Sequence, residues 1–131
     1  PFQRIHLERQ FDPSLGTIRC DPTEIQQVLL NLLKNAAQAL RGIAHPHITL
    51  RTSREAGFAR IQVIDNGPGM DEDIRKRIFE PFFTTKAVGQ GTGLGLSVSY
   101  FIVTEQHQGR LSVRSEPGQG ACFTVLLPIS D

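Results

Sequence analysis

Apolar residues recur every three or four positions along the early part of the chain, which predicts an amphipathic helix over residues 21–41. Asp21 stands directly before Pro22 and three residues before Glu24, the pattern of a capping box at the start of a helix. The helix is expected to end near Gly42. Its apolar face is formed by Ile25, Val28, Leu29, Leu32, Leu33, Ala36, Ala37 and Leu40.

Alternation of apolar and polar residues predicts strands in the rest of the chain. Four strands are well marked and form two hairpins, the first with its turn at residues 56–57 and the second with its turn at 116–120. Two weaker extended stretches come before the long helix. The expected strands are 4–10, 17–20, 47–54, 59–66, 110–115 and 121–127.

Two shorter helices are expected, one over residues 71–80 and one over 94–107. Between them, residues 81–95 are rich in glycine and aperiodic, which indicates a long functional loop. Together the elements predict an α+β fold, a two-layer sandwich in which a mixed, mostly antiparallel sheet is covered on one face by about three helices. The side chains expected to face inward are Ile74 and Ile78 in the first short helix and Val98, Phe101 and Ile102 in the second.

Composition narrows the classes of protein to which the chain can belong. The chain has 131 residues, of which 39% are hydrophobic and 21% charged, so we expect one folded domain over residues 1–131. A net charge of +1 argues against nucleic-acid binding, and no apolar run reaches the roughly 20 residues that span a bilayer. Because the chain opens at Pro1 without a methionine, we interpret it as a fragment. Cys20 and Cys122 are isolated, which favours buried thiols of a cytosolic domain and excludes a structural zinc site built on Cys/His pairs.

A row of side-chain amides follows one edge of the apolar stripe on the long helix. Asn31 and Asn35 are four residues apart, and Gln38 follows three residues later. Asparagine is a poor helix former, so two of them in mid-helix need an explanation. Either the amides bond solvent or backbone, or they line a polar cleft. In a cleft, an amide oxygen would suit Mg²⁺ that also binds phosphate oxygens.

Asp65 continues the inward alternation of the strand over 59–66, so its carboxylate is expected on the buried face. Burying a carboxylate costs folding free energy unless the carboxylate accepts hydrogen bonds. One explanation is an Asx turn over the following residues. The other is a ligand with a donor group, such as the exocyclic amine of a purine, and Gly67 and Gly69 would allow close backbone approach to such a flat ligand.

A glycine-rich segment over residues 89–96 leads into the last expected helix. Backbone N–H groups at a helix N-terminus favour phosphate, but the spacing matches neither a Rossmann site nor a P-loop. Before it, Phe79, Phe82 and Phe83 are most simply a hinge packed on the core. Lys86 is a candidate phosphate contact.

In order and spacing, these features resemble the ATP-binding catalytic domain of sensor histidine kinases, in the superfamily that includes gyrase, MutL and heat-shock chaperones. The match covers about residues 20–127, and Thr84-Thr85-Lys86 is most similar to nitrogen-regulation-type sensor kinases. The four matching motifs are the N box at 31–36, the G1 box at 65–70, the F box at 79–83 and the G2 box at 91–96.

The resemblance implies that the domain binds ATP and Mg²⁺. Asp65 would bond the adenine amine, with Gly69 assisting through water, and Asn35 would ligate Mg²⁺. Residues 81–95 would form a lid over the ATP. The residues expected at the nucleotide are Asn31, Asn35, Gln38, Asp65, Gly67, Gly69, Met70, Ile78, Thr84, Thr85, Lys86, Gly91, Thr92, Gly93, Leu94, Gly95 and Leu96.

Within this set, Ile78 and Leu96 would flank the base. Asn31, Gln38 and Lys86 would lie near the phosphates. At the position of Gln38 the family often has lysine. Asn31 and Lys86 are the candidates for positioning phosphate, and the resemblance identifies no certain catalytic residue.

The family's phosphoacceptor histidine lies in a separate helical-hairpin domain. None of the four histidines here has its sequence context, and His6 is interpreted as a surface residue on a strand. The resemblance therefore implies a cytoplasmic fragment that is itself a monomer. Its parent protein would be a homodimer, either soluble or membrane-anchored, whose dimerisation domain accepts the phosphate. It also implies a response regulator receiver domain as partner and no nucleic acid. The four histidines are His6, His45, His47 and His107.

The competing function is an ATPase clamp of the gyrase or MutL type. Those proteins carry a glutamate general base four residues before the Mg²⁺-binding asparagine. That position is Asn31 here, and an amide cannot accept the proton of an attacking water. A serine kinase that antagonises a sigma factor would also be expected to carry an acidic residue there, and a degenerate nucleotide-binding module would not be expected to keep all four motifs.

Overall fold

The protein is a mixed sheet with helices packed against it. A computed structural model describes residues 4–83 and 95–129. In chain order its elements are β1 (His6–Gln10), α1 (Pro22–Ala39), β2 (His47–Glu55), β3 (Phe58–Asp65), α2 (Glu72–Arg77), α3 (Gly95–Phe101), a π-helical turn η1 (Ile102–Gln106), β4 (Arg110–Ser115) and β5 (Ala121–Pro128).

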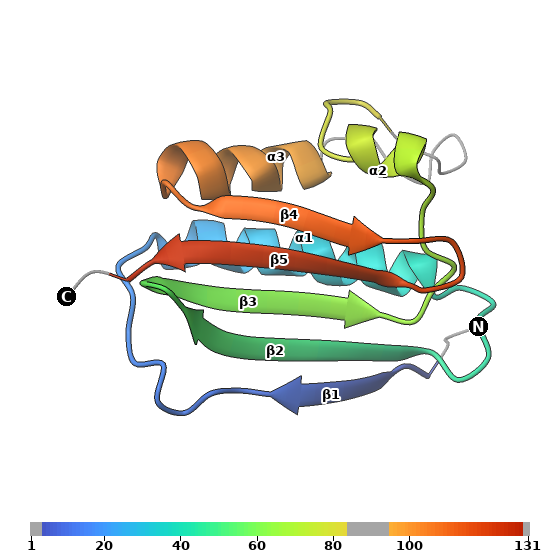
Figure 1. Cartoon of the computed structure of the whole chain (residues 1–131), viewed down its shortest axis with the longest axis horizontal. Coiled ribbons are helices and arrows are strands. Elements are labelled where there is room, and N and C mark those ends of the chain that lie inside the picture. The colour runs from blue at the N-terminus through green and yellow to red at the C-terminus, as the bar shows by residue number, and fades with distance from the viewer. Residues whose placement is uncertain (1–3, 84–94, 130–131) are drawn as a thin grey trace.

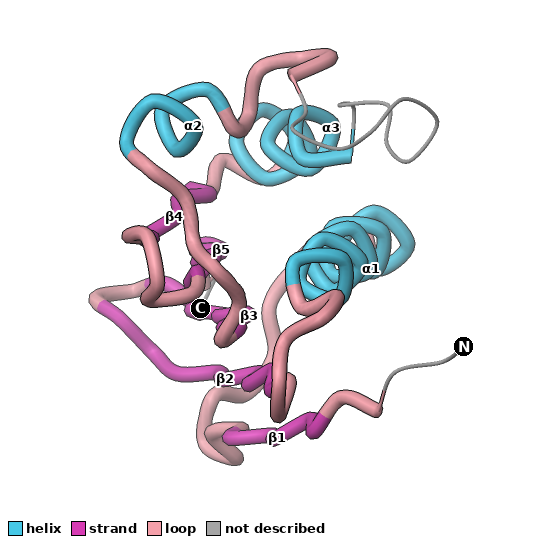
Figure 2. Tube along the Cα trace, turned by 90° about the vertical axis from the view of Figure 1, so that its right-hand side faces the viewer, coloured by secondary structure: helices cyan, strands magenta, loops and turns pink. Residues whose placement is uncertain are grey.

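The five strands form one sheet in the order β1-β2-β3-β5-β4 (Figure 1). β1 pairs with β2 in parallel, and the other three neighbouring pairs are antiparallel. α1 and α3 lie on the same side of the sheet, and α2 lies beside β4 (Figure 2). The predicted α+β sandwich with a mostly antiparallel sheet is therefore confirmed. Among the described helices, none combines the length and apolar character that crossing a membrane requires.

The core lies between α1 and the sheet, because the apolar stripe of α1 meets the inward residues of the strands. Side chains from α1, from four strands and from η1 are buried together, and this contact carries most of the apolar burial of the fold. The buried core residues are Ile25, Val28, Leu32, Ala36, Leu40, Ile48, Val63, Ile102, Val103, Leu111, Phe123, Val125 and Leu127.

The start of α1 differs in one detail from the predicted capping box. The Asp21 carboxylate accepts a hydrogen bond from the Glu24 N–H at 3.2 Å, as predicted. The Asp21 N–H, which Glu24 would cap in a complete box, donates to Nε2 of His107 at 3.0 Å. A residue 86 positions away therefore provides the second half of this cap.

The predicted strand over 17–20 is wrong, since those residues take no part in the sheet. Ile18 and Cys20 instead pack against the core as part of the connection from β1 to α1, which explains their apolar alternation. The thiols of Cys20 and Cys122 are free, as predicted, but both residues are only half-buried. Cys122 alternates with the core residue Phe123 and so lies on the face of the sheet away from the core.

The predicted inward face of the last helix is also partly wrong. Ile102 is buried, but Val98 and Phe101 are 44% and 53% exposed. Ser99 and Val103 are fully buried instead. Ser99 can take an inward position because its hydroxyl donates to the Gly95 carbonyl at 2.9 Å, which removes most of the cost of burying it.

Candidate functional site

A cleft of about 290 Å³ opens between the end of α1, the end of β3, the loop after β3, and α2. Six of the residues predicted from the sequence line it: Asn35, Gln38, Asp65, Gly69, Met70 and Ile78. Five further residues line it that were not predicted: Ala39, Arg41, Pro68, Ile74 and Ala121. The cleft thus combines apolar walls with a few polar groups, which is typical of a small-molecule site.

Asp65 lies at the last position of β3 and points into the cleft. Its side chain is buried, as predicted, and only 5% of the residue is exposed. One carboxylate oxygen, Oδ1, accepts a hydrogen bond from the Gly67 N–H at 2.9 Å, which forms the Asx turn. Burial raises the pKa of the Asp65 carboxyl above its usual 3.8, while hydrogen bonds from the backbone at Gly67 and Ala121 act in the opposite direction. The two explanations considered for Asp65 are therefore compatible, because the carboxylate forms the Asx turn and also faces the cleft.

The loop after β3 passes very close to the chain's own backbone. Gly69 has a φ of +75°, and a Cβ atom there would lie 2.1 Å from the carbonyl oxygen of Glu116. A Cβ atom at Gly67 would lie 3.0 Å from the carbonyl oxygen of Ala39. The need for glycine at position 69 thus arises from contacts within the protein, whereas position 67 is only tightly packed. Gly69 also lines the cleft.

The turn between β4 and β5 holds this loop in place. The Met70 N–H donates to the Ser115 hydroxyl at 2.9 Å, and that hydroxyl donates to the Gly120 carbonyl at 2.7 Å. The Gly118 N–H donates to the Pro68 carbonyl at 2.7 Å. The wall of the cleft that carries Met70 is therefore fixed from a part of the chain about 45 residues away.

The amide row of α1 divides into two parts. Asn35 and Gln38 line the cleft, and the buried oxygen Oε1 of Gln38 has no hydrogen-bond partner among the described residues. Asn31 does not line the cleft. Its Nδ2 donates to the Gly95 carbonyl and to the Ser99 hydroxyl, and its Oδ1 accepts from Gln27, so it joins α1 to α3.

Arg41 is a functional candidate that the sequence reasoning missed. It lies just after α1, is exposed, and supplies the only cationic side chain among the described residues that line the cleft. Its position continues the spacing of the amide row, because it follows Gln38 by three residues. That spacing was the signal that could have identified it.

The aromatic residues before the glycine-rich segment form the predicted hinge only in part. Phe79 packs against Tyr100 with ring centroids 5.2 Å apart and meets the core residue Phe123 edge-on at 6.2 Å. Phe82 is 73% exposed with a positive φ of 67°. The Arg77 guanidinium lies over the ring of Phe83, at 4.5 Å.

The remaining predicted contacts divide between described and undescribed residues. Gly95 and Leu96 begin α3, and Leu96 packs against the core, but neither lines the cleft. Most of the predicted lid and its phosphate contacts lie outside the described residues. These are Thr84, Thr85, Lys86, Gly91, Thr92, Gly93 and Leu94.

Curated relatives of this chain are sensor kinases. It is 44% identical over 128 residues to the signal transduction histidine-protein kinase AtoS of Escherichia coli K12, an alignment that covers 97% of this chain and 20% of AtoS. It is 43% identical over 128 residues to sporulation kinase E of Bacillus subtilis 168, covering 98% of this chain and 17% of that kinase. With the histidine kinase/phosphatase NtrB of Vibrio alginolyticus it shares 39% over 135 residues, covering 95% of this chain and 37% of NtrB. The chain thus spans well under half of each relative.

Solved structures with the same fold are also histidine kinase domains. The nucleotide-free catalytic domain of the histidine kinase ThkA superposes with a TM-score of 0.82 at 30% identity, covering 97% of this chain and 82% of that one. Full-length ShkA in complex with AMPPNP gives a TM-score of 0.82 at 33% identity, covering 96% of this chain and 26% of ShkA. ThkA in complex with the response regulator protein TrrA gives a TM-score of 0.79 at 28% identity, covering 96% of this chain and 34% of that one.

The cleft, with a buried carboxylate at its base and amides along one helix, occupies the part of the fold where the sequence motifs predicted a nucleotide site. Residues 20–131 match the family model described as histidine kinase-, DNA gyrase B-, and HSP90-like ATPase. The fold and the relatives agree with that match, and the chain therefore belongs to the family of histidine kinase-, DNA gyrase B- and HSP90-like ATPases.

Proposed function

We propose that this chain is the ATP-binding catalytic domain of a two-component sensor histidine kinase. In this function it presents the γ-phosphate of bound Mg·ATP to a histidine on the dimerisation domain of its parent protein, and the phosphate then passes to a response regulator. The observation that carries the proposal is Asp65, a buried carboxylate aimed into an otherwise largely apolar cleft.

Asp65 is suited to recognising adenine. The carboxylate accepts backbone hydrogen bonds at Gly67 and Ala121. Because an ionised carboxylate has about four acceptor positions, it can also accept a hydrogen bond from the exocyclic amine. Met70, Ile74 and Ile78 supply apolar surface on which a flat base can pack. A site of this kind discriminates strongly against a base that lacks the amine, because the buried carboxylate would then be left without its partner.

The phosphate end of the cleft lies along α1. Asn35 and Gln38, whose Oε1 has no partner in the described part of the chain, supply neutral oxygen atoms of the kind Mg²⁺ prefers. Arg41 supplies a positive charge for the phosphates. The residues present therefore fit a magnesium ion held mainly by Asn35 and by phosphate oxygens. When bound, the ion neutralises the negative charge that develops on the transferred phosphoryl group.

The ATPase clamp function is less well supported. At the position where such a clamp carries its general base, Asn31 is an amide whose donors are already used by Gly95 and Ser99. No group at this position can take a proton from an attacking water. The nucleophile is therefore expected to come from another domain, with the phosphohistidine, and not free phosphate, as the first product.

The proposal is tested by mixing the chain with labelled ATP, Mg²⁺ and a helical-hairpin domain from the same parent protein. We expect acid-labile label on the histidine of the hairpin, and almost none when the Asp65→Asn variant replaces the wild type. Asp73→Asn, an exposed carboxylate on α2, is the matched control and should transfer phosphate normally. Rapid release of free phosphate by the chain alone would contradict the proposal and favour the clamp.

A cytoplasmic position and a homodimeric parent are part of the same proposal. ATP and response regulators are both cytoplasmic, so the domain has to lie there whether or not its parent is anchored in a membrane. The fragment itself is expected to be a monomer, and size-exclusion chromatography with light scattering would test this.

A further inference from the structure

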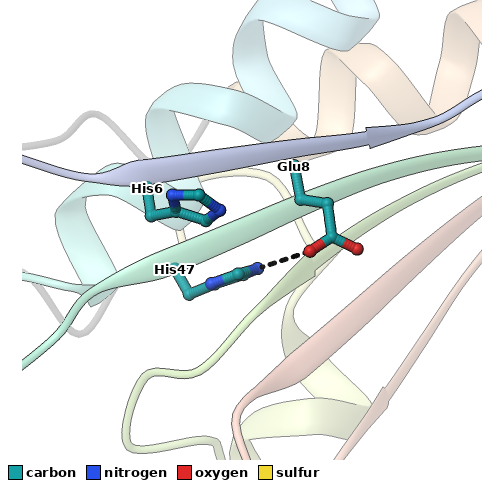
Figure 3. Close-up of side chains that lie close together, drawn as sticks. All are labelled: His6, Glu8 and His47. Carbon is teal, nitrogen blue, oxygen red and sulfur yellow. Dashed lines mark ion pairs between the residues drawn. The ribbon is translucent and has the colours of Figure 1, made fainter.

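Two histidines and a glutamate come together on the face of the sheet that α1 and α3 leave uncovered (Figure 3). His6 and Glu8 are two residues apart on β1, so their side chains share one face. His47 pairs with His6 in the parallel register and alternates with the core residue Ile48, which places it on the same face. The cluster is separate from the nucleotide cleft, none of whose lining residues it includes.

The geometry of the three side chains is close to that of a metal site. One ligand atom from each lies within 4.8 Å of the others. His47 Nε2 is 3.7 Å from Glu8 Oε1, and the two imidazole rings have centroids 4.6 Å apart. Two ligands of a tetrahedral Zn²⁺ are separated by about 3.4 Å, since each bond is about 2.1 Å long. Binding an ion therefore requires side-chain rotations that bring the three ligand atoms closer together, and the partly exposed positions of Glu8 and His47 leave room for them.

Neighbouring residues hold the glutamate in a suitable orientation. Glu8 Oε2 accepts a hydrogen bond from the Gln10 amide, and Gln10 Oε1 accepts one from Arg51 Nε at 2.8 Å. The other oxygen, Oε1, is the one directed toward His47 (Figure 3). Supporting hydrogen bonds of this kind orient a ligating carboxylate and raise the affinity of a metal site.

The backbone of His47 is held equally firmly. Its N–H donates to the Asn66 side chain at 2.7 Å, and its carbonyl accepts from the Asn66 N–H. The site thus stands on two paired strands rather than on loops, which favours a fixed ligand geometry.

We propose that His6, Glu8 and His47 form a surface site for a divalent late transition metal ion, with Zn²⁺ as its ion. Two imidazoles and one carboxylate select such ions over Mg²⁺ and Ca²⁺, which prefer oxygen ligands. Three protein ligands leave room for water or a ligand from a partner. The bound ion ties β1 to β2. Ligand spacing along the sequence could not indicate this site, because the parallel pairing of two strands brings residues 6 and 47 together.

Calorimetric titration of the 131-residue chain with ZnCl₂, without nucleotide, tests the proposal. We expect one ion per chain. His6→Gln and His47→Gln should each weaken binding at least about tenfold, because losing even an outer-shell partner of a ligand costs that much. His45→Asn is the matched control, because His45 is an exposed histidine two residues from the site and outside the cluster. It should leave the affinity unchanged. Absence of binding, or equal losses in His45→Asn, would overturn the proposal and leave Glu8 and His47 as an ion pair only.

Electron paramagnetic resonance with Cu²⁺ gives a readout that does not depend on the affinity of the variants. The wild-type chain should show hyperfine coupling to two imidazole nitrogens, and His6→Gln to one. Circular dichroism checks that each variant is folded, which is expected because the three side chains are on the surface. Two-nitrogen coupling that persists in both His6→Gln and His47→Gln would place the ion at other ligands and overturn the assignment.

Discussion

The Asn31 amide on α1 donates a 3.1 Å hydrogen bond to the hydroxyl of Ser99 on α3. The same amide nitrogen lies 3.2 Å from the Gly95 carbonyl, at the first residue of α3. The helix that follows the glycine-rich segment is thereby anchored to the helix that carries the cleft amides. Asn31 thus has a structural role that its place in the N box did not reveal.

Replacing Asn31 by alanine should lower the free energy of unfolding by about 1–2 kcal/mol, because two hydrogen bonds to the partly buried start of α3 are lost. Asn35→Ala is the matched control. It lies one turn later on α1 and lines the cleft, and alanine favours the helix by up to about 0.7 kcal/mol. Urea denaturation of both variants checks the prediction. Equal stability of the two variants would show that the contact between Asn31 and Ser99 contributes little.

Asn35→Ala should separate nucleotide binding from magnesium dependence. We expect the affinity for ATP without Mg²⁺ to change little. The gain in affinity on adding Mg²⁺ should fall at least about tenfold, because losing even an outer-shell partner of a metal ligand costs that much and Asn35 is the proposed ligand itself. Isothermal titration with and without Mg²⁺ measures both quantities. If the magnesium dependence is kept in full, the ion is held by other residues.

Asp65→Asn should be at least as stable as the wild type at pH 7, although it binds nucleotide poorly. Burial raises the pKa of Asp65 above 3.8, so the folded state holds the proton more tightly than the unfolded state does. The stability that this group contributes is therefore present below pH 3.8 and lost as the pH rises through the raised pKa. An asparagine carries no charge, and its oxygen can still accept from Gly67.

Urea denaturation at several pH values and nucleotide titration test this prediction together. The stability advantage of Asp65→Asn over the wild type should shrink toward pH 4, while the affinity for ATP at pH 7 should fall by about 1.5–3 kcal/mol, the usual value of a hydrogen bond to a charged group. A variant that becomes less stable than the wild type as the pH rises would show that the carboxylate stabilises the fold.

Gly69→Ala should be strongly destabilising, whereas Gly118→Ala should cost only about 1–2 kcal/mol. Both glycines have a positive φ, +75° and +79°, so both pay the cost of a left-handed conformation. Only at Gly69 would the new Cβ atom meet another group, at 2.1 Å from the Glu116 carbonyl oxygen. Chemical denaturation of the two variants isolates the effect of that contact. Similar losses in both would mean that the loop can move away without cost.

Much of the fold could be predicted because burial leaves a direct trace in the sequence. The apolar stripe of α1 and the alternation that places Val63 and Asp65 on one face are both local patterns. The errors occur where a distant residue changes the outcome. Ser99 is buried at the contact with α1, where the Asn31 amide donates to its hydroxyl, while the apolar Val98 is left exposed. His107 takes the place that Glu24 was expected to fill at the cap of α1.

In the candidate site, too, residues with a local sequence pattern could be predicted, and residues that depend on distant contacts could not. Asp65 was found because a carboxylate in an apolar alternation stands out in the sequence. Ser115 was missed, since its hydroxyl matters only through hydrogen bonds to Met70 and Gly120 that the β4–β5 turn brings about. Similarly, no local pattern predicts that the parallel pairing of β1 and β2 places His6 beside His47.

The contact between Gly69 and Glu116 changes how mutations at this motif should be interpreted. A descendant of this domain that no longer used nucleotide would still need glycine at position 69 in order to fold, because the carbonyl of Glu116 leaves no space for a side chain. It would gain stability by losing the buried charge of Asp65. An inactive relative is therefore expected to keep the glycine and replace the aspartate, so that the acidic residue, rather than the glycine motif, distinguishes a working site from a vestigial one.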